Sequence, residues 1–186
     1  NLGSCTELRK ELYGLYKDKG LLMKKYDNIF TDKSLNNFFY LELIKDIYPE
    51  AKIIHCKRDT LSSIMSIFQN NLTESAWTHN LENIFKYFDN YFKIIDKFKK
   101  KYPNFIYDLD FENFTNQPEI ESKKLMSFCD LPWDKKCLEF YKREDLFSKT
   151  ASNIQIRSAI YKHSLEKYLP YKKFLNQYGE KYSWFK

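Results

Sequence analysis

The sequence predicts a single α/β domain, residues 1–186, in which helices flank a mainly parallel sheet. Short runs rich in β-branched and aromatic residues alternate with longer segments of helical periodicity, as in parallel strands joined by helices. A length of 186 residues is enough for one domain with a sizeable core. The content of 43% hydrophobic and 18% aromatic residues is typical of a folded chain, because each aromatic side chain buries a large area.

The first predicted elements are a helix and a short strand. Leucines recur on one face of residues 7–17, Thr6 is suited to cap the start of this helix, and Gly20 follows its end. Residues 28–32 form the first strand candidate. Together they predict an N-terminal helix that leads into the sheet.

A second helix and the clearest strand follow. Asp32 or Ser34 is expected to cap a helix that runs through Tyr48, with an apolar stripe at helical spacing. Residues 51–57 (AKIIHCK) are a β-branched run bounded by a proline turn and a charged pair. This pattern predicts a buried strand.

The rest of the chain repeats the alternation of helix and strand. Asp59 or Thr60 is expected to cap a helix that ends near Asn70, and residues 78–101 carry apolar side chains at helical spacing. Residues 105–110 (FIYDLD) are a further strand candidate. Three more helices are predicted. The first runs from Pro118 to near Asp130, the second is short and ends at Tyr141, and the third covers residues 170–177.

Glycine content limits the kinds of nucleotide site that the chain can hold by itself. The four glycines are scattered and form no Gly-rich loop, which excludes a self-contained Walker-type or GxGxxG site within these residues. The formal net charge of +6 indicates an anionic partner without naming one.

Cysteine and histidine contents argue against a metal site and a disulfide framework. The four cysteines show no C-x-x-C spacing, and the chain has three histidines. This pattern predicts a reducing, cytoplasmic location. No apolar run is long enough to span a membrane.

Reactive side chains gather where predicted strands end, and ligands of parallel sheets bind beyond the carboxyl ends of the strands. Arg58 comes directly after one strand and precedes a helix start, where a guanidinium and a helix dipole can meet an anion such as a phosphate. Ser66, two turns into that helix, can add a hydroxyl. The alternative is that Arg58 pairs with Asp59 or Glu74, and that Ser66 only packs. Lys33, at another helix start, is open to the same two interpretations.

Taken together, the segments resemble the bacterial sulfotransferase family related to tyrosylprotein sulfotransferases. Residues 27–72 contain TDKSLNNF, LELI, YPEAKIIH, RDT and SIF, which match that family's T-D-K-x-P-x-N-F, L-x-L-I, F-P-x-A-K-I-I-H, R-D-P and S-I-F segments in order. The resemblance continues in three later segments: YDLDFENF, FCDLPWDKKCLEFY and TASNIQIRSAIYKHSLEKY. It covers essentially the whole chain and implies a three-layer, P-loop NTPase-like sulfotransferase fold.

The resemblance implies transfer of a sulfuryl group from 3′-phosphoadenosine 5′-phosphosulfate (PAPS) to a hydroxyl or amine, without a metal. Arg58 and Ser66 match the family positions that hold the 3′-phosphate, and Lys33 matches the lysine between sulfate and 5′-phosphate. Glu7, in CTEL, resembles the family's general base, although a helix-start glutamate is also favoured by the helix dipole. The residues that match the segment closing over the nucleotide are Ser152, Gln155, Arg157 and Lys167.

Departures from the family pattern fall at three prolines and before the first residue. Leu35, Thr60 and Ala159 stand where the family has proline, and none of these changes removes an anion-binding side chain. The family's P-R-S-G-T-T-like loop, which wraps the 5′-phosphosulfate, is expected before Asn1, so the chain is expected to be N-terminally incomplete.

Three functions are compatible with these patterns. The first is a sulfotransferase whose acceptor is a protein tyrosine, a carbohydrate or a small molecule, with no nucleic-acid partner. The second is a non-catalytic nucleotide-binding or interaction module that kept the fold. The third is a basic single-stranded nucleic-acid binder, which the placement of most aromatic residues on apolar helical stripes disfavours.

Overall fold

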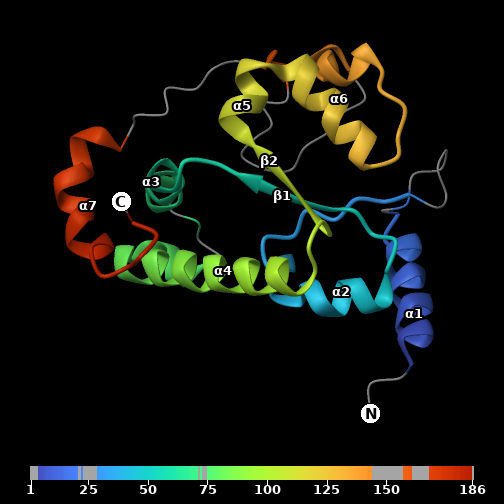
Figure 1. The fold of residues 1–186 in the computed structure, drawn as a ribbon, viewed down its shortest axis with the longest axis horizontal. Coiled ribbons are helices and arrows are strands. Elements are labelled where there is room, and N and C mark those ends of the chain that lie inside the picture. Colours follow the sequence, from blue (N-terminus) through green and yellow to red (C-terminus); the bar gives the residue numbers. More distant parts are fainter. Residues whose placement is uncertain are drawn as a thin grey trace. The chain divides into compact units, whose positions relative to one another are not determined.

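A computed structural model describes residues 4–20, 22, 29–70, 72, 75–143, 157–160 and 168–185. The chain divides into two compact units. Figure 1 labels their helices and strands. Unit 1 comprises Asn1–Ala51 and Tyr91–Pro103, and unit 2 comprises Lys52–Asn90 and Asn104–Lys186. Ser152, Gln155 and Lys167 lie outside the described residues.

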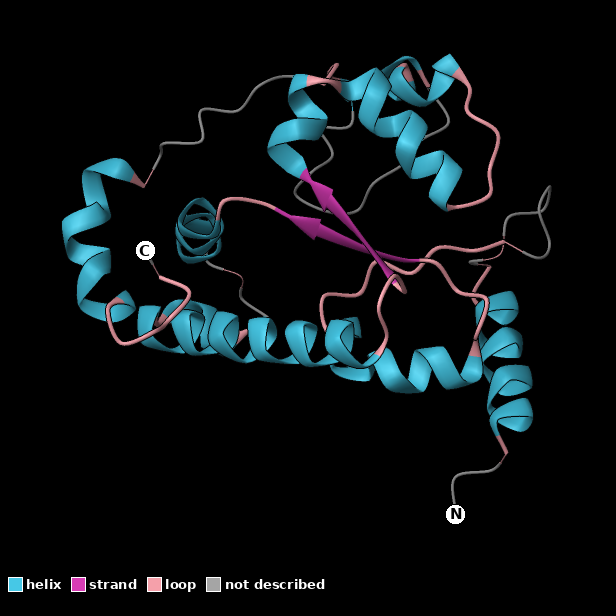
Figure 2. Ribbon diagram, in the orientation of Figure 1, coloured by secondary structure: helices cyan, strands magenta, loops and turns pink. Residues whose placement is uncertain are grey.

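Unit 2 contains a parallel pair of strands, β1 (Ile53–Lys57) and β2 (Ile106–Asp110) (Figure 2). The register places Lys57 opposite Asp110, so the two carboxyl ends lie at the same edge. Both strands fall where the sequence predicts them, and the parallel sheet with flanking helices confirms the α/β class. The predicted burial of β1 is wrong, because His55 is the one buried residue of this strand.

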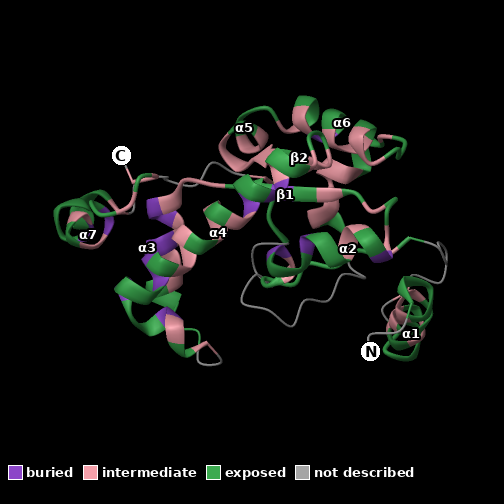
Figure 3. Ribbon diagram, turned by 60° about the horizontal axis from the view of Figure 1, so that its bottom comes forward, coloured by how far each residue is buried: buried purple, intermediate pink, exposed green. Residues whose placement is uncertain are grey.

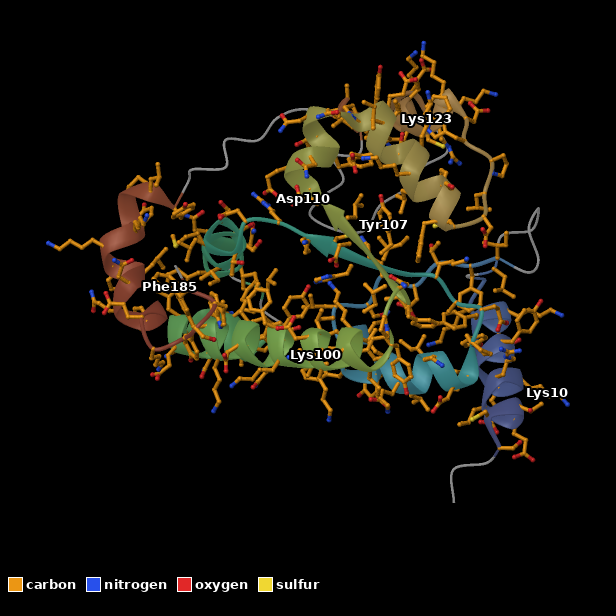
Figure 4. The ribbon with its side chains drawn as sticks, in the orientation of Figure 1. Lys10, Lys100, Tyr107, Asp110, Lys123 and Phe185 are labelled. Carbon is orange, nitrogen blue, oxygen red and sulfur yellow. The ribbon has the colours of Figure 1, made fainter. Side chains whose placement is uncertain are left out.

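The helices of unit 2 follow the two strands. Asp59 caps α3 (Thr60–Asn70) because its Oδ1 accepts the Ser62 N–H at 2.7 Å. After β2, the Asp110 carboxylate caps α5 by accepting the Asn113 N–H at 2.8 Å (Figure 4). The other elements of this unit are η2 (Ala76–His79), the first part of α4 (Leu81–Lys101), α5 (Phe111–Asn116), α6 (Pro118–Phe128), η3 (Lys135–Leu138), η4 (Phe140–Lys142), η7 (Leu169–Tyr171) and α7 (Lys172–Gly179).

The core of unit 2 joins α3, α4 and α7, and Figure 3 shows the buried residues along α3. Ile64, Phe85 and Leu175 are fully buried in it, one from each helix. Aromatic rings of the C-terminal segment surround Phe85, with the Trp184 ring centroid at 5.8 Å and that of Phe185 at 5.9 Å. These rings pack the last residues of the chain against α4.

Gly179 is a position in this core where a side chain does not fit. A Cβ at Gly179 would lie 2.3–2.5 Å from carbons of the Phe185 ring, which lies beside α7 (Figure 4). We expect Gly179→Ala to lower the free energy of unfolding by about 2 kcal/mol, because the ring must move. Chemical denaturation measures this change.

Gly14→Ala is the matched control, since no atom lies within 4 Å of the Cβ it would add. Gly14 lies within the helix α1, so alanine is expected to raise the stability there by about 0.5–1 kcal/mol. Equal stability of Gly179→Ala and the wild-type protein would show that the Phe185 contact does not constrain the fold.

Unit 1 consists of α1 (Cys5–Asp18), η1 (Asn37–Tyr40), α2 (Leu41–Ile47) and the last part of α4. Arg9 fastens α1 to the end of α2: its Nε donates to the Ile47 carbonyl at 2.7 Å, and its Nη2 contacts the Glu50 carboxylate at 3.0 Å. At the end of α4, Lys101 forms an ion pair with Glu42 of α2 at 2.6 Å. These contacts hold the helices of unit 1 together.

Three predictions in unit 1 are wrong. The first helix is capped by Ser4 and not by Thr6, because Ser4 and Glu7 form a reciprocal capping box. The predicted strand at 28–32 is absent from its described residues, and the following helix begins only at Asn37. The cause is Asp32, whose carboxylate accepts the Ser34 N–H at 2.8 Å and so closes a turn there instead of capping a helix.

Other boundaries shift in unit 2. Asn80 caps α4 by accepting the Asn83 N–H, so this helix begins at Leu81 and the buried Thr78 lies in η2. The predicted short helix before Tyr141 is two 3₁₀ turns, and the last helix is Lys172–Gly179, preceded by a 3₁₀ turn. The sequence patterns missed α5, which is only six residues long.

In the part of the chain that the structure describes, no helix is long and apolar enough to cross a membrane. All four cysteines are free thiols there. Within the same part of the chain, no group of three or more His, Cys, Asp or Glu side chains is arranged to hold a metal ion.

Candidate functional site

The candidate anion site lies in unit 2, where β1 and β2 end side by side. Since Lys57 is opposite Asp110, the residues that leave the sheet next are Arg58 and Phe111. The Arg58 Cζ lies 5.4 Å from the centroid of the Phe111 ring. A guanidinium over an aromatic face is held through its face by cation–π attraction, so its N–H groups remain hydrogen-bond donors in its plane.

The start of α3 is built beside this arginine. Its cap residue, Asp59, donates its own backbone N–H to the Glu112 Oε1 at 3.0 Å. The Asp59 side chain caps the helix and forms no ion pair with Arg58 among the described residues. Of the two predicted alternative partners of Arg58, Asp59 is therefore otherwise engaged, and Glu74 lies outside the described residues.

Arg58 carries an orphaned polar atom. Its Nε is buried and has no hydrogen-bond partner in the part of the chain that the structure describes. A buried donor without a partner costs about 1–3 kcal/mol, which an anionic acceptor would offset. The atom therefore fits a site for a phosphate, next to a helix start whose dipole also favours negative charge.

Ser66 lies further along the same helix and is partly buried. Its Oγ accepts a hydrogen bond from the Asn70 Nδ2 at 3.2 Å, and its carbonyl accepts from the same nitrogen at 2.7 Å. Because Oγ acts as an acceptor in this contact, the Ser66 hydroxyl hydrogen can be donated elsewhere. The structure places Arg58 and Ser66 on the one segment that leaves β1.

A polar cluster that the sequence patterns missed crosses the two strands. His55 is buried on β1, and its Nδ1 lies 2.7 Å from the Oδ1 of Asp108, its register partner on β2. The Lys57 ammonium lies 3.7 Å from the other carboxylate oxygen of Asp108. Alternation along each strand puts these side chains on one face, so only the register, and not either strand alone, reveals the cluster.

Lys33 belongs to unit 1 and follows Asp32, which has a well-defined environment. The Tyr16 hydroxyl donates to Asp32 Oδ2 at 2.5 Å, and the Asn37 Nδ2 donates to Oδ1 at 3.0 Å. Burial raises the pKa of Asp32, but the hydrogen bonds from Tyr16, Ser34 and Asn37 outweigh it and hold the pKa well below its usual value. Asp32 is therefore a carboxylate throughout the physiological range.

Tyr16 shows the reciprocal effect. Its hydrogen bond to Asp32, together with burial, raises the pKa of the Tyr16 hydroxyl to about 12. The hydroxyl thus remains a donor at any physiological pH. Lys33 itself is exposed and forms no ion pair with the described residues.

Glu7 is exposed near the start of α1, and its carboxylate takes part in the capping box. Its Oε2 accepts the Ser4 N–H at 2.7 Å, while its own N–H donates to the Ser4 Oγ at 3.3 Å. The helix-start role that the sequence offers as an alternative is therefore present. Glu7 lies nine residues before Tyr16, the residue that contacts Asp32, and this spacing corresponds to about 13.5 Å along the axis of α1.

Arg157 is exposed, in a short described segment. It is the one residue of the predicted closing segment that the structure describes, since Ser152, Gln155 and Lys167 fall outside. Their predicted roles stay predictions.

Comparison with known proteins identifies the family. Residues 4–135 match the family described as "Sulfotransferase family". A relative from Aquifex aeolicus (strain VF5), described as an uncharacterized protein, is 34% identical over 172 residues, which cover 90% of this chain and 22% of the relative. The chain thus spans about a fifth of the length of the curated relative it matches. The matched residues include both strands, Arg58 and the start of α3, and the chain belongs to the sulfotransferase family.

Proposed function

We propose that the protein transfers a sulfuryl group from PAPS to a hydroxyl or amine acceptor. Family membership supports sulfuryl transfer in general. The environment of Arg58 is the observation that supports PAPS as the sulfuryl donor. Its guanidinium lies on Phe111 at the edge of the sheet, and its buried Nε lacks a partner among the described residues. A fixed cation of this kind suits the 3′-phosphate that distinguishes PAPS from simpler adenine nucleotides.

In this proposal, Arg58, which lies between β1 and α3, and Ser66 of α3 bind the nucleotide. Arg58 donates to the 3′-phosphate through its guanidinium edge, and Ser66 donates its hydroxyl to the same group. The dipole of α3, an 11-residue helix, adds positive potential at its first turn. Ser152, Gln155, Arg157 and Lys167 are proposed to close over the nucleotide, on the strength of the resemblance.

The resemblance alone supports the proposed roles of Lys33 and Glu7 on the reacting groups. PAPS supplies the sulfuryl group, and adenosine 3′,5′-bisphosphate (PAP) leaves when the sulfur–oxygen bond to the 5′-phosphate breaks. Lys33 neutralises the negative charge that grows on that oxygen, and Glu7 accepts the proton of the acceptor hydroxyl or amine. Neither role needs a metal ion.

The test is the binding of PAP to wild-type protein and to Arg58→Ala. We expect the substitution to raise the Kd about 100-fold, because charge-assisted hydrogen bonds to a phosphate contribute about 3 kcal/mol together. Isothermal titration calorimetry on the full-length protein measures the constants.

Arg58→Lys is the conservative variant, since lysine keeps the charge but not the planar fork; an intermediate Kd is expected. Arg143→Ala, which removes an exposed arginine of the same unit, is expected to leave the Kd within about twofold. Equal Kd values for wild-type protein and Arg58→Ala would refute the assignment of Arg58.

A second candidate function is a nucleotide-binding module that does not transfer sulfate. The observation that favours it is the Glu7 carboxylate, which the capping box already employs. This candidate shares the PAP site with the first and differs only in lacking the transfer step.

A further inference from the structure

Asp32 receives hydrogen bonds from three different parts of unit 1. Tyr16 of α1 donates its hydroxyl to Oδ2 at 2.5 Å, while Ser34 and Asn37 donate a backbone N–H and a side-chain amide to Oδ1 at 2.8 and 3.0 Å. A carboxylate that accepts three donors is held in one orientation. Asp32 therefore fixes the short turn of residues 32–34 against the neighbouring helix.

The ring of Tyr16 strengthens this attachment. Its centroid lies 4.7 Å from that of Phe30, and Phe30 in turn meets the Tyr48 ring edge-on at 5.9 Å. The chain before the turn is thus packed by rings, and the turn itself is held by hydrogen bonds. The Tyr16 hydroxyl can be removed without disturbing the ring contacts.

Lys33 lies between the two residues that the turn joins. Its neighbour Asp32 is saturated by other donors, and Lys33 forms no ion pair with the described residues. The backbone on both sides of Lys33 is consequently fixed, while its ammonium is left to meet an anion. The lysine side chain still rotates about four bonds, but an anchored backbone limits the region that its ammonium can reach.

We propose that Asp32 is a positioning residue for Lys33 in sulfuryl transfer, and that the Tyr16 hydroxyl holds Asp32 in place. The inference rests on the proposed function of Lys33 and deepens it. A purely structural role for the same hydrogen bonds would lower the stability of unit 1 without touching the step that Lys33 serves.

The test is a double-mutant cycle on the full-length protein with Tyr16→Phe and Lys33→Ala. Tyr16→Phe is expected to lower kcat about tenfold, with an unchanged KM for PAPS and an unchanged Kd for PAP, because a misplaced catalytic group slows only the chemical step. In the Lys33→Ala background the same change is expected to lower kcat by less than about twofold. Tyr40→Phe, which alters an exposed tyrosine of the same unit, is the control and should leave kcat unchanged.

Hydrogen exchange provides a readout that does not depend on turnover. The Ser34 amide is expected to exchange about tenfold faster in Tyr16→Phe than in the wild-type protein, since its acceptor is no longer held. Unchanged exchange would overturn the role of Tyr16.

The outcomes separate this inference from the function on which it rests. A wild-type protein that transfers no sulfuryl group refutes the proposed function, and the positioning role falls with it. An active wild-type protein in which the effects of Tyr16→Phe and Lys33→Ala simply multiply refutes the positioning role alone.

Discussion

Replacing Lys33 by alanine is expected to lower kcat about 1,000-fold, the effect of losing a preorganised charge at a leaving oxygen. The ammonium is needed only when negative charge develops, so the KM for PAPS is expected to change by less than about threefold. Initial rates of sulfuryl transfer over a range of PAPS concentrations separate the two constants.

The position of Lys33 allows its effect on the reaction to be separated from any effect on the stability of the fold. It is exposed and has no ion pair among the described residues, so alanine is expected to leave the free energy of unfolding unchanged within about 0.5 kcal/mol. Lys33→Arg keeps the charge and should retain part of the rate. A higher KM with an unchanged kcat would mean that Lys33 only binds the nucleotide and takes no part in transfer.

Glu7→Gln is expected to lower kcat at least 100-fold, which is the usual contribution of a general base. Glutamine completes a capping box as glutamate does, so the stability of α1 should be nearly unchanged. The substitution therefore removes the proton acceptor and keeps the cap. Transfer rates and chemical denaturation of the same preparation measure both properties.

Glu7→Ala is the companion variant, because it removes both the cap and the carboxylate. It should lower kcat as glutamine does and also lower the free energy of unfolding by about 1 kcal/mol. A Glu7→Gln protein with full activity would show that Glu7 is a helix cap only, and another group would have to accept the proton.

Sequence patterns predicted both described strands within two residues, for a clear physical reason. The runs at 51–57 and 105–110 join β-branched and aromatic residues to turn signals, so local preference and tertiary structure agree. At 28–32 they disagree: the Phe30 ring packs against Tyr16 of α1 and Tyr48 at the end of α2, and Asp32 closes a turn with the Ser34 N–H. The Ser4–Glu7 capping box, in contrast, was readable as an S-x-x-E signature.

The candidate site, like the fold, could be predicted from the sequence only in part. A basic residue directly after a strand could be found from the sequence, and the structure places Arg58 at that edge. Its partner Phe111 could not, because it lies 53 residues away along the chain and meets Arg58 only through the strand register. The same holds for the His55–Asp108 pair and for the Tyr16–Asp32 hydrogen bond, each of which joins separate elements.

The most direct test of the proposed function is transfer of sulfur-labelled sulfate from PAPS by the full-length protein to a panel of phenolic, carbohydrate and amine acceptors. We predict that label appears on at least one acceptor, that PAP is released in equal amount, and that both are lost in Lys33→Ala. A protein that binds PAP through Arg58 and yet labels none of these hydroxyl or amine acceptors would contradict the transfer function, and the non-catalytic nucleotide-binding module would replace it.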